Sequence, residues 1–308
     1  MFVEYNKIEN SSKKWDENYK KVKQWAVTEK VHGANFSFIY NTDTATFNCA
    51  RRNGILEENE FFYNHKSVMN DNIQYLNNII NKIKELNINF QSIIIYGEIF
   101  GGLYPNFHSK IKAVQKGVFY SPNIHFYAFD IYICNGEEGY YLDFEKTLNI
   151  FKESGIMYCE PLAIFNNVTD ALNYNYTFNS TIYKKFGLPE VPNNKAEGVV
   201  IKSMTNRYVV KLKTDEFCET VALQSGNKHI NTTNKNNIFE IAKTHITQNR
   251  FNNAVSKVGP DNVNEIINIF VDDIIFELDI TDDKLIKNVK SMLYKETNSR
   301  LNEFLTNN

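Results

Sequence analysis

The spacing of apolar residues changes along this chain of 308 residues, and that change limits the folds open to it. In the stretch NFSFIY, Phe36, Phe38 and Tyr40 occupy every second position, which is the pattern of a strand with one face in the core. From about Asn231 onward the apolar residues follow helical spacing instead, as in the stretch 263–278. Strands followed by helices predict an α+β fold, with a mixed domain first and a small all-α domain after it.

Other elements follow from the same patterns. Further strands are expected at apolar stretches rich in β-branched and aromatic residues: 25–30, 44–50, 92–98, 125–133, 196–203 and 207–214. Helices are expected at 71–86, from the cap residue Asp143 to Gly155, and at 237–246, 263–278 and 284–305. The stretch 224–237 is polar and without periodicity, so it predicts a linker. We therefore expect one domain over residues 1–226 and a helical domain over 227–308.

Composition excludes several classes of protein. The chain is 43% hydrophobic and 23% charged, which is ordinary for a globular protein with a full core. The net charge of −2 argues against a polycation that coats nucleic acid, although a local basic groove stays possible. The four cysteines form no CxxC pair and predict reduced thiols. With no membrane-length apolar run and no signal peptide visible, we expect an intracellular, cytoplasmic protein, and a viral origin is compatible with this.

The stretch TEKVHGANF places Lys30 where a strand gives way to a tight turn. A lysine that attacks an electrophile must first lose its proton, and nearby cations or desolvation favour that loss. Lys211 and Lys213 lie two apart on a predicted strand, so both point to one face and together can neutralise a phosphate. Each feature alone is more often a solvated surface lysine.

The order of short motifs is more specific. KVHGAN is followed by ARRNG, YGE, FYAFDI, EGVVIK and VVKLK. This series resembles the motif set of the covalent nucleotidyltransferases, which comprise polynucleotide ligases and capping enzymes. DNA ligases and capping enzymes usually carry Asp-Gly after the lysine, whereas the His-Gly found here resembles the RNA ligase 2 family. That family includes phage and viral RNA ligases and the trypanosome RNA-editing ligases. The resemblance covers roughly residues 24–220.

The resemblance implies a nucleotidyltransferase (ATP-grasp-like ligase) domain of antiparallel sheets with helices, followed by the small all-α domain. It also implies an ATP-dependent RNA ligase that acts through a lysyl-AMP and an adenylylated RNA end. The implied cofactors are ATP and Mg²⁺ or Mn²⁺. The implied substrate is RNA, most simply a nick in a duplex, with 5′-phosphate and 3′-hydroxyl ends. Residues 232–308 would engage RNA or dock a protein partner.

Matching positions carry the family's roles to this chain. Lys30 would be the nucleophile, and Lys211 and Lys213 would grip the α-phosphate; these three are the expected catalytic residues. The expected nucleotide-binding residues are Glu29 and Phe129 at the adenine, Asn35, Arg52 and Glu98 at the phosphates and ribose, and Glu197, with His32 in support. Glu197 would also hold the metal ion through water. The expected RNA contacts are Arg52 at the 5′-phosphate, its neighbour Arg51, and Lys110 and Lys112 in a basic loop.

Lys202 is a weaker candidate for a site residue beside Glu197. It lies five positions after Glu197, so on a flat strand the two side chains would point to opposite faces.

Two alternatives stay open at this point. A DNA ligase or capping guanylyltransferase would carry an all-β domain after the last motif, whereas this chain turns helical. A non-catalytic RNA-end-binding subunit is the second alternative, and an intact Lys30 and Lys211 count against it.

Overall fold

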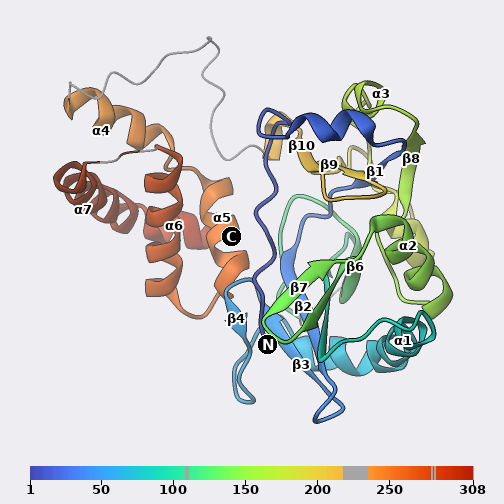
Figure 1. The fold of residues 1–308 in the computed structure, drawn as a ribbon. Helices are drawn as coiled ribbons and strands as arrows, with labels where there is room; N and C mark the ends of the chain where they lie inside the picture. The colour runs from blue at the N-terminus through green and yellow to red at the C-terminus, as the bar shows by residue number, and fades with distance from the viewer. Residues whose placement is uncertain (108–110, 218–234, 279, 281, 308) are drawn as a thin grey trace. The chain divides into compact units, whose positions relative to one another are not determined.

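The computed structural model describes residues 1–107, 111–217, 235–278, 280 and 282–307 (Figure 1). Contacts between residues divide the chain into two compact units, Met1–Thr214 and Asp215–Asn308. The predicted boundary between residues 226 and 227 lies outside the described residues, as does most of the predicted linker. The two units are therefore described separately.

The first unit contains two antiparallel sheets. The six-stranded sheet has the order β4-β3-β2-β5-β6-β7. Its strands are β2 (Ala34–Asn41), β3 (Thr46–Arg51), β4 (Gly54–Ile55), β5 (Ser92–Leu103), β6 (Ser121–Asn135) and β7 (Glu138–Tyr141). The four-stranded sheet has the order β10-β9-β1-β8. Its strands are β1 (Trp25–Glu29), β8 (Pro161–Phe165), β9 (Gly198–Ser203) and β10 (Val209–Lys213). The predicted antiparallel sheets with helices are confirmed.

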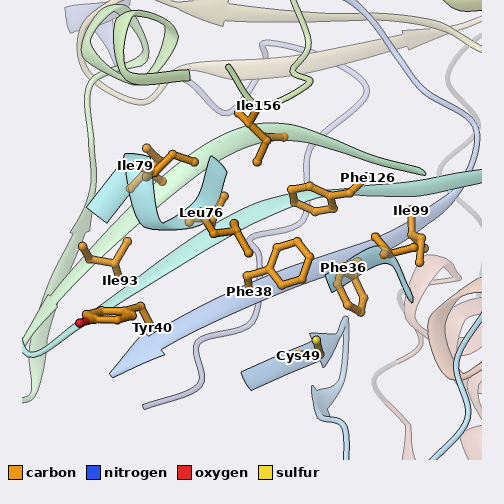
Figure 2. Packing of buried hydrophobic residues seen from close by; sticks show 14 of the residues in the cluster. Phe36, Phe38, Tyr40, Cys49, Leu76, Ile79, Ile93, Ile99, Phe126 and Ile156 are labelled. Atoms are coloured by element: carbon orange, nitrogen blue, oxygen red, sulfur yellow. The ribbon is translucent and has the colours of Figure 1, made fainter. Parts of the chain in front are cut away.

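Each sheet buries one face under helices. On the six-stranded sheet, α1 (His65–Glu85) and α2 (Phe144–Ser154) cover the face that carries Phe38 and Phe126. Figure 2 shows Leu76 of α1 beside Phe38, and Ile79 belongs to the same core cluster. On the four-stranded sheet, the short helix α3 (Val168–Leu172) and the 3₁₀ turn Glu17–Lys21 cover the face that carries Trp25 and Val27. The opposite face of each sheet carries candidate site residues, which are described below.

One helix boundary and one helix cap differ from the sequence expectation. Helix α1 begins at His65 rather than at residue 71, directly after Tyr63 and Asn64, whose φ angles are 42° and 58°. Helix α2 begins after Asp143 and ends at Gly155, as predicted. The Asp143 side chain does not cap this helix, however, because its Oδ1 accepts a hydrogen bond from the backbone N–H of Asn206 at 3.2 Å.

The second unit is helical in its described part, as predicted. Its helices are α4 (Lys235–Thr244), α5 (Gln248–Val258), α6 (Val263–Glu277), α7 (Asp283–Ser299) and α8 (Leu301–Asn307). Phe251, Phe270 and Phe304 pack together at the centre of its core. The sequence patterns missed α5 and treated α7 and α8 as one element. Whether this unit engages RNA or a protein partner stays a prediction.

Candidate active site

Lys30 directly follows the last residue of β1, an interior strand of the four-stranded sheet. Its backbone N–H donates to the carbonyl of Gly198 at 2.9 Å, which ties the start of β9 to the end of β1. Its Nζ lies 2.8 Å from Oε2 of Glu197, and its side chain is 21% exposed. A lysine in this position is both held and reachable from solvent.

Glu197 is the centre of a cationic cluster. Besides Lys30, its carboxylate contacts Nζ of Lys213 at 3.0 Å and Nδ1 of His32 at 3.4 Å. Burial by itself raises the pKa of this carboxyl, since its side chain is only 3% exposed. The charges of Lys30 and Lys213 and the bond to His32 outweigh burial and hold the pKa of Glu197 well below its usual range.

A glycine allows the two lysine-bearing segments to meet. Gly198 has a φ of 147°, and a Cβ at this position would lie 2.0 Å from the carbonyl oxygen of Leu212. The antiparallel register places Lys213 opposite Gly198 and Lys211 opposite Val200. The alternation of side chains along β10 therefore puts Lys211 and Lys213 on one face, as predicted.

The six-stranded sheet contributes further residues to the site. Asn35 on β2 lies directly opposite Glu98 on β5, on the face away from α1. Burial raises the pKa of Glu98 to about 7, and the charges of Lys30, Glu197 and Arg52 also act on this carboxyl. Since electrostatic effects of this kind fall with distance, Glu98 belongs to the same site as Lys30 and Glu197.

The first adenine candidate, Glu29, is deeply buried. Its side chain accepts hydrogen bonds from the Ser180 side chain and the Thr181 backbone, and burial raises its pKa to about 7. Its Oε1 atom has no hydrogen-bond partner within the described part of the chain. A buried acceptor without a donor costs free energy unless a ligand supplies one.

The second adenine candidate, Phe129, sits at a β-bulge in β6. The register with β5 shifts between Tyr96 and Gly97, so Phe129 and Asp130 both reach the face away from α1. The Phe129 ring is partly buried and lies 4.9 Å from the ring of Tyr5.

Asp130 is the centre of a second charged cluster, which the sequence patterns did not predict. Its Oδ2 atom accepts from the Tyr5 hydroxyl at 2.5 Å, from Lys202 Nζ at 2.9 Å and from Arg207 Nη1 at 3.3 Å. Lys202 also donates to the carbonyl of Phe129 at 2.9 Å. A signal was present in the sequence, because a carboxylate inside the apolar stretch FYAFDIYI requires buried partners.

Lys202 therefore does not join the Glu197 cluster. It is 4% exposed and is paired with Asp130 behind Phe129. Lys202 is thus separate from the lysines that contact Glu197.

The two adjacent arginines point to different faces. Arg51 pairs across the sheet with the core residue Phe36, and its guanidinium contacts Glu60 at 3.1 Å. Arg52 lies in the following turn, where its Nη2 donates to the carbonyl of Tyr5 at 3.2 Å and its charge acts on Glu98. The structure thus brings Arg52 near Glu98 and places Arg51 on the face of the sheet that carries Phe36, and RNA contact by either arginine stays a prediction.

The predicted basic loop is only partly described. Lys110 lies outside the described residues. Lys112 is exposed, and its backbone lies close to Gly102 at the end of β5. Gln115, three residues further on, donates to the carbonyl of Gly33 at 3.5 Å. The loop therefore packs beside the turn that follows Lys30.

The site combines cationic and acidic groups. Lys30 and Lys213 contact the carboxylate of Glu197, and Lys211 shares the face of β10 that carries Lys213. Lysines gathered in this way suit a polyanionic ligand. Among the described residues, no group of three or more His, Cys, Asp or Glu side chains could hold a metal ion. The residues fit a hydrated divalent ion that is bound mainly by a ligand's phosphates, with Glu197 at its edge.

A family model described as RNA ligase matches residues 23–214, which is more than half of the chain. The chain belongs to the RNA ligase family. The resemblance to the RNA ligase 2 family is thereby confirmed, and the DNA ligase and capping alternatives lose their support.

Two curated relatives of the family come from Trypanosoma brucei brucei. The mitochondrial RNA-editing ligase 2 is 30% identical over 233 residues, which is 66% of this chain and 55% of that protein. The mitochondrial RNA-editing ligase 1 is 27% identical over 237 residues, 64% of this chain and 50% of that protein. The chain thus spans about half the length of the curated relatives it matches.

Solved structures of Naegleria gruberi RNA ligase are also similar. The complex with PPi has a TM-score of 0.48 at 17% identity and covers 70% of this chain and 57% of that one. A variant with ATP and Mn has a TM-score of 0.48 at 18% identity, with the same coverage. In the parts of the present chain that the structure describes, no helix is both long and apolar enough to cross a membrane.

Proposed function

We propose that this protein is an ATP-dependent RNA ligase that joins 5′-phosphate and 3′-hydroxyl RNA ends, with nicks in duplex RNA as its substrate. The observation that carries the proposal is the convergence of Lys30, Lys213 and His32 on the buried carboxylate of Glu197. This arrangement supports a covalent nucleotidyl transfer, because the proposed nucleophile and the proposed phosphate-binding lysine Lys213 lie together around one carboxylate.

The reaction has three balanced steps. The amine of Lys30 attacks the α-phosphate of ATP, a phosphorus–nitrogen bond forms and pyrophosphate leaves. The 5′-phosphate of the RNA then attacks the lysyl-AMP, which frees Lys30 and gives an adenylylated RNA end. The 3′-hydroxyl of the other strand finally attacks that end, a phosphodiester forms and AMP leaves. Lys211 and Lys213 would stabilise the charge that develops on the α-phosphate in these steps.

The walls of the pocket fit the remaining parts of ATP. The unpartnered Oε1 of Glu29 can accept from the adenine amino group, and Phe129 offers a ring for stacking. Asn35 and Glu98 lie opposite each other on the neighbouring strands β2 and β5, and they would contact the ribose and phosphates. A bound Mg²⁺ or Mn²⁺ would supply charge neutralisation at the phosphates, with Glu197 holding its water.

The proposed RNA contacts in the first unit are Arg52 and Lys112. Arg52 would contact the 5′-phosphate and Lys112 the backbone of the duplex. In the second unit, residues 232–308 would engage RNA or a protein partner. Recognition of a nicked duplex would rest on phosphates and 2′-hydroxyls, because the deep groove of A-form RNA hides its base edges.

The first test is intact mass after incubation with Mg²⁺ and ATP or GTP, on protein first stripped of AMP with pyrophosphate. We expect the mass of one AMP to be added from ATP only, and no addition in Lys30→Ala. Lys20→Ala, which changes an exposed lysine paired with Glu17, is the matched control and should behave as wild type. Nick sealing on RNA and DNA duplexes then defines the substrate. No adduct with either nucleotide would refute the proposal and leave a non-catalytic RNA-binding relative.

A further inference from the structure

The segment Phe2–Glu9, which we call the strap, contacts both sheets of the first unit. At one end, Tyr96 of β5 donates its hydroxyl hydrogen to the carbonyl of Val3 at 2.6 Å. At the other end, Glu9 forms a parallel bridge with Val210, and the N–H of Lys211 donates to the carbonyl of Glu9 at 3.0 Å. The strap therefore connects the six-stranded sheet to the strand that carries the phosphate-binding lysines.

Tyr5 fixes the middle of the strap. It is 4% exposed, and its hydroxyl bonds Asp130 at 2.5 Å. Its ring lies 5.0 Å from that of Tyr96 and 4.9 Å from that of Phe129, both nearly edge to face. The hydroxyl bond and the two ring contacts hold the Tyr5 side chain in place. They thereby fix its backbone and that of the neighbouring residue Glu4.

The fixed part of the strap grips Arg52. The carbonyl of Tyr5 accepts from Nη2 at 3.2 Å, and Oε1 of Glu4 lies 3.3 Å from Nε. The side chain of Glu4 is 56% exposed, whereas that of Arg52 is 22% exposed. Glu4 thus contributes little to the core, and its described contact is with the arginine that faces the site.

We propose that Glu4 is a positioning residue that presets the guanidinium of Arg52 for the 5′-phosphate of the RNA. This inference rests on the proposed function. Immobilising a long side chain on binding costs free energy, and a contact that exists before binding removes part of that cost. The strap contacts two of the guanidinium nitrogens, Nε and Nη2, so within the described part of the chain Nη1 is left for a phosphate.

The sign of the effect separates positioning from plain electrostatics. Glu4 is an anion close to a site for an anionic substrate. By Coulomb's law alone, its removal would strengthen RNA binding. If Glu4 acts by positioning, its removal weakens RNA binding instead. A competitor for Arg52 and a positioner of Arg52 therefore give opposite results.

The experiment compares Glu4→Gln and Glu4→Ala with Glu17→Gln, an exposed control outside the strap. Three quantities are measured: the rate of lysyl-AMP formation, the KM for a nicked 5′-phosphate RNA in AMP transfer, and the sealing rate of pre-adenylylated RNA. We expect both Glu4 variants to raise that KM about 3- to 10-fold, with lysyl-AMP formation within about 2-fold of wild type. In an Arg52→Lys background, Glu4→Gln should add no further change, because the preset guanidinium is already gone.

Other outcomes overturn the inference. A lower or unchanged KM in the Glu4 variants would make Glu4 a competitor or a bystander. An equal loss in all three measurements, with a lower melting temperature, would make it structural. If the wild type forms no lysyl-AMP, it is the proposed function that fails, which is a distinct result.

Discussion

Replacing Glu29 by glutamine should make the protein more stable at alkaline pH while weakening its use of ATP. Burial raises the pKa of Glu29 from an ordinary value of 4.5 to about 7 in the folded protein. Between these two values, the folded state binds more protons than the unfolded state, so stability falls as pH rises. Below pH 4.5 the carboxyl is neutral in both states and the penalty vanishes.

The size of the penalty follows from the two pKa values. A shift of this kind costs about 1 kcal/mol at pH 5.5 and about 3 kcal/mol at pH 8.5, where the carboxyl is ionised in both states. Glutamine has nearly the same shape but carries no charge, so Glu29→Gln removes this penalty. The gain in the free energy of unfolding should therefore be about 2 kcal/mol larger at pH 8.5 than at pH 5.5.

Urea unfolding at the two pH values measures this difference, and the matched control is Glu153→Gln. Glu153 is exposed and pairs with Lys82, so its change should stay within about 0.5 kcal/mol at both pH values. In the mass assay, Glu29→Gln should need more ATP for lysyl-AMP formation, because an amide accepts less strongly from the adenine amino group than a carboxylate does. A Glu29→Gln protein that is no more stable than wild type at pH 8.5 would refute the reasoning about burial.

Three further predictions concern the structure around Lys30 and Phe129. Asp130→Asn should lower the free energy of unfolding by about 3 kcal/mol at pH 7, since it leaves the buried Lys202 ammonium without its counterion. Because the pKa of Asp130 in the folded protein is lowered from 3.8, its contribution to the free energy of unfolding is complete above pH 3.8 and is lost as pH falls further. Urea unfolding at pH 7 and pH 3 measures this, and a larger effect of Asp130→Asn at pH 3 than at pH 7 would contradict it. Gly198→Ala should nearly abolish lysyl-AMP formation, measured by intact mass, because its Cβ would meet the Leu212 carbonyl; near-normal labelling would contradict the close approach. Lys112→Ala should raise the KM for RNA a few-fold and reduce its salt dependence without affecting lysyl-AMP formation, and an unchanged salt dependence would exclude a phosphate contact.

The sequence predicted the elements that have strong local patterns. The alternation in β2, the apolar run of β5 and the change to helical spacing before α6 all correspond to observed elements, because burial of one face imposes its period on the residues. Helix α5 escaped prediction because its asparagine-rich sequence, QNRFNNAVSKV, masks the apolar face that packs on α6. Its start depends on a local cap by Thr247.

Parts of the site were out of reach because they depend on pairing register and long-range contacts. Spacing alone could not distinguish Arg51 from Arg52. The pairing of β3 with β2 puts Arg51 opposite the core residue Phe36, whereas Arg52 lies in the turn that follows and contacts Tyr5. The role of Tyr5 could not be predicted either, since its partner Asp130 is 125 positions away along the chain. The pairing of Lys202 with Asp130 likewise depends on a bulge that the alternation in β6 does not reveal.

The ion pair between Lys30 and Glu197 also bears on chemical durability. An amine that can attack ATP could also be acylated or form imines with reactive aldehydes and acyl donors in its surroundings. The contact of 2.8 Å between Nζ of Lys30 and the buried carboxylate of Glu197 must open before such a reagent can bond to this nitrogen. A bound polyanion that competes for the same cations would loosen this pair. Lys30 would therefore react more slowly with stray lysine-modifying reagents until a nucleotide binds, and its reactivity would be coupled to the arrival of the substrate.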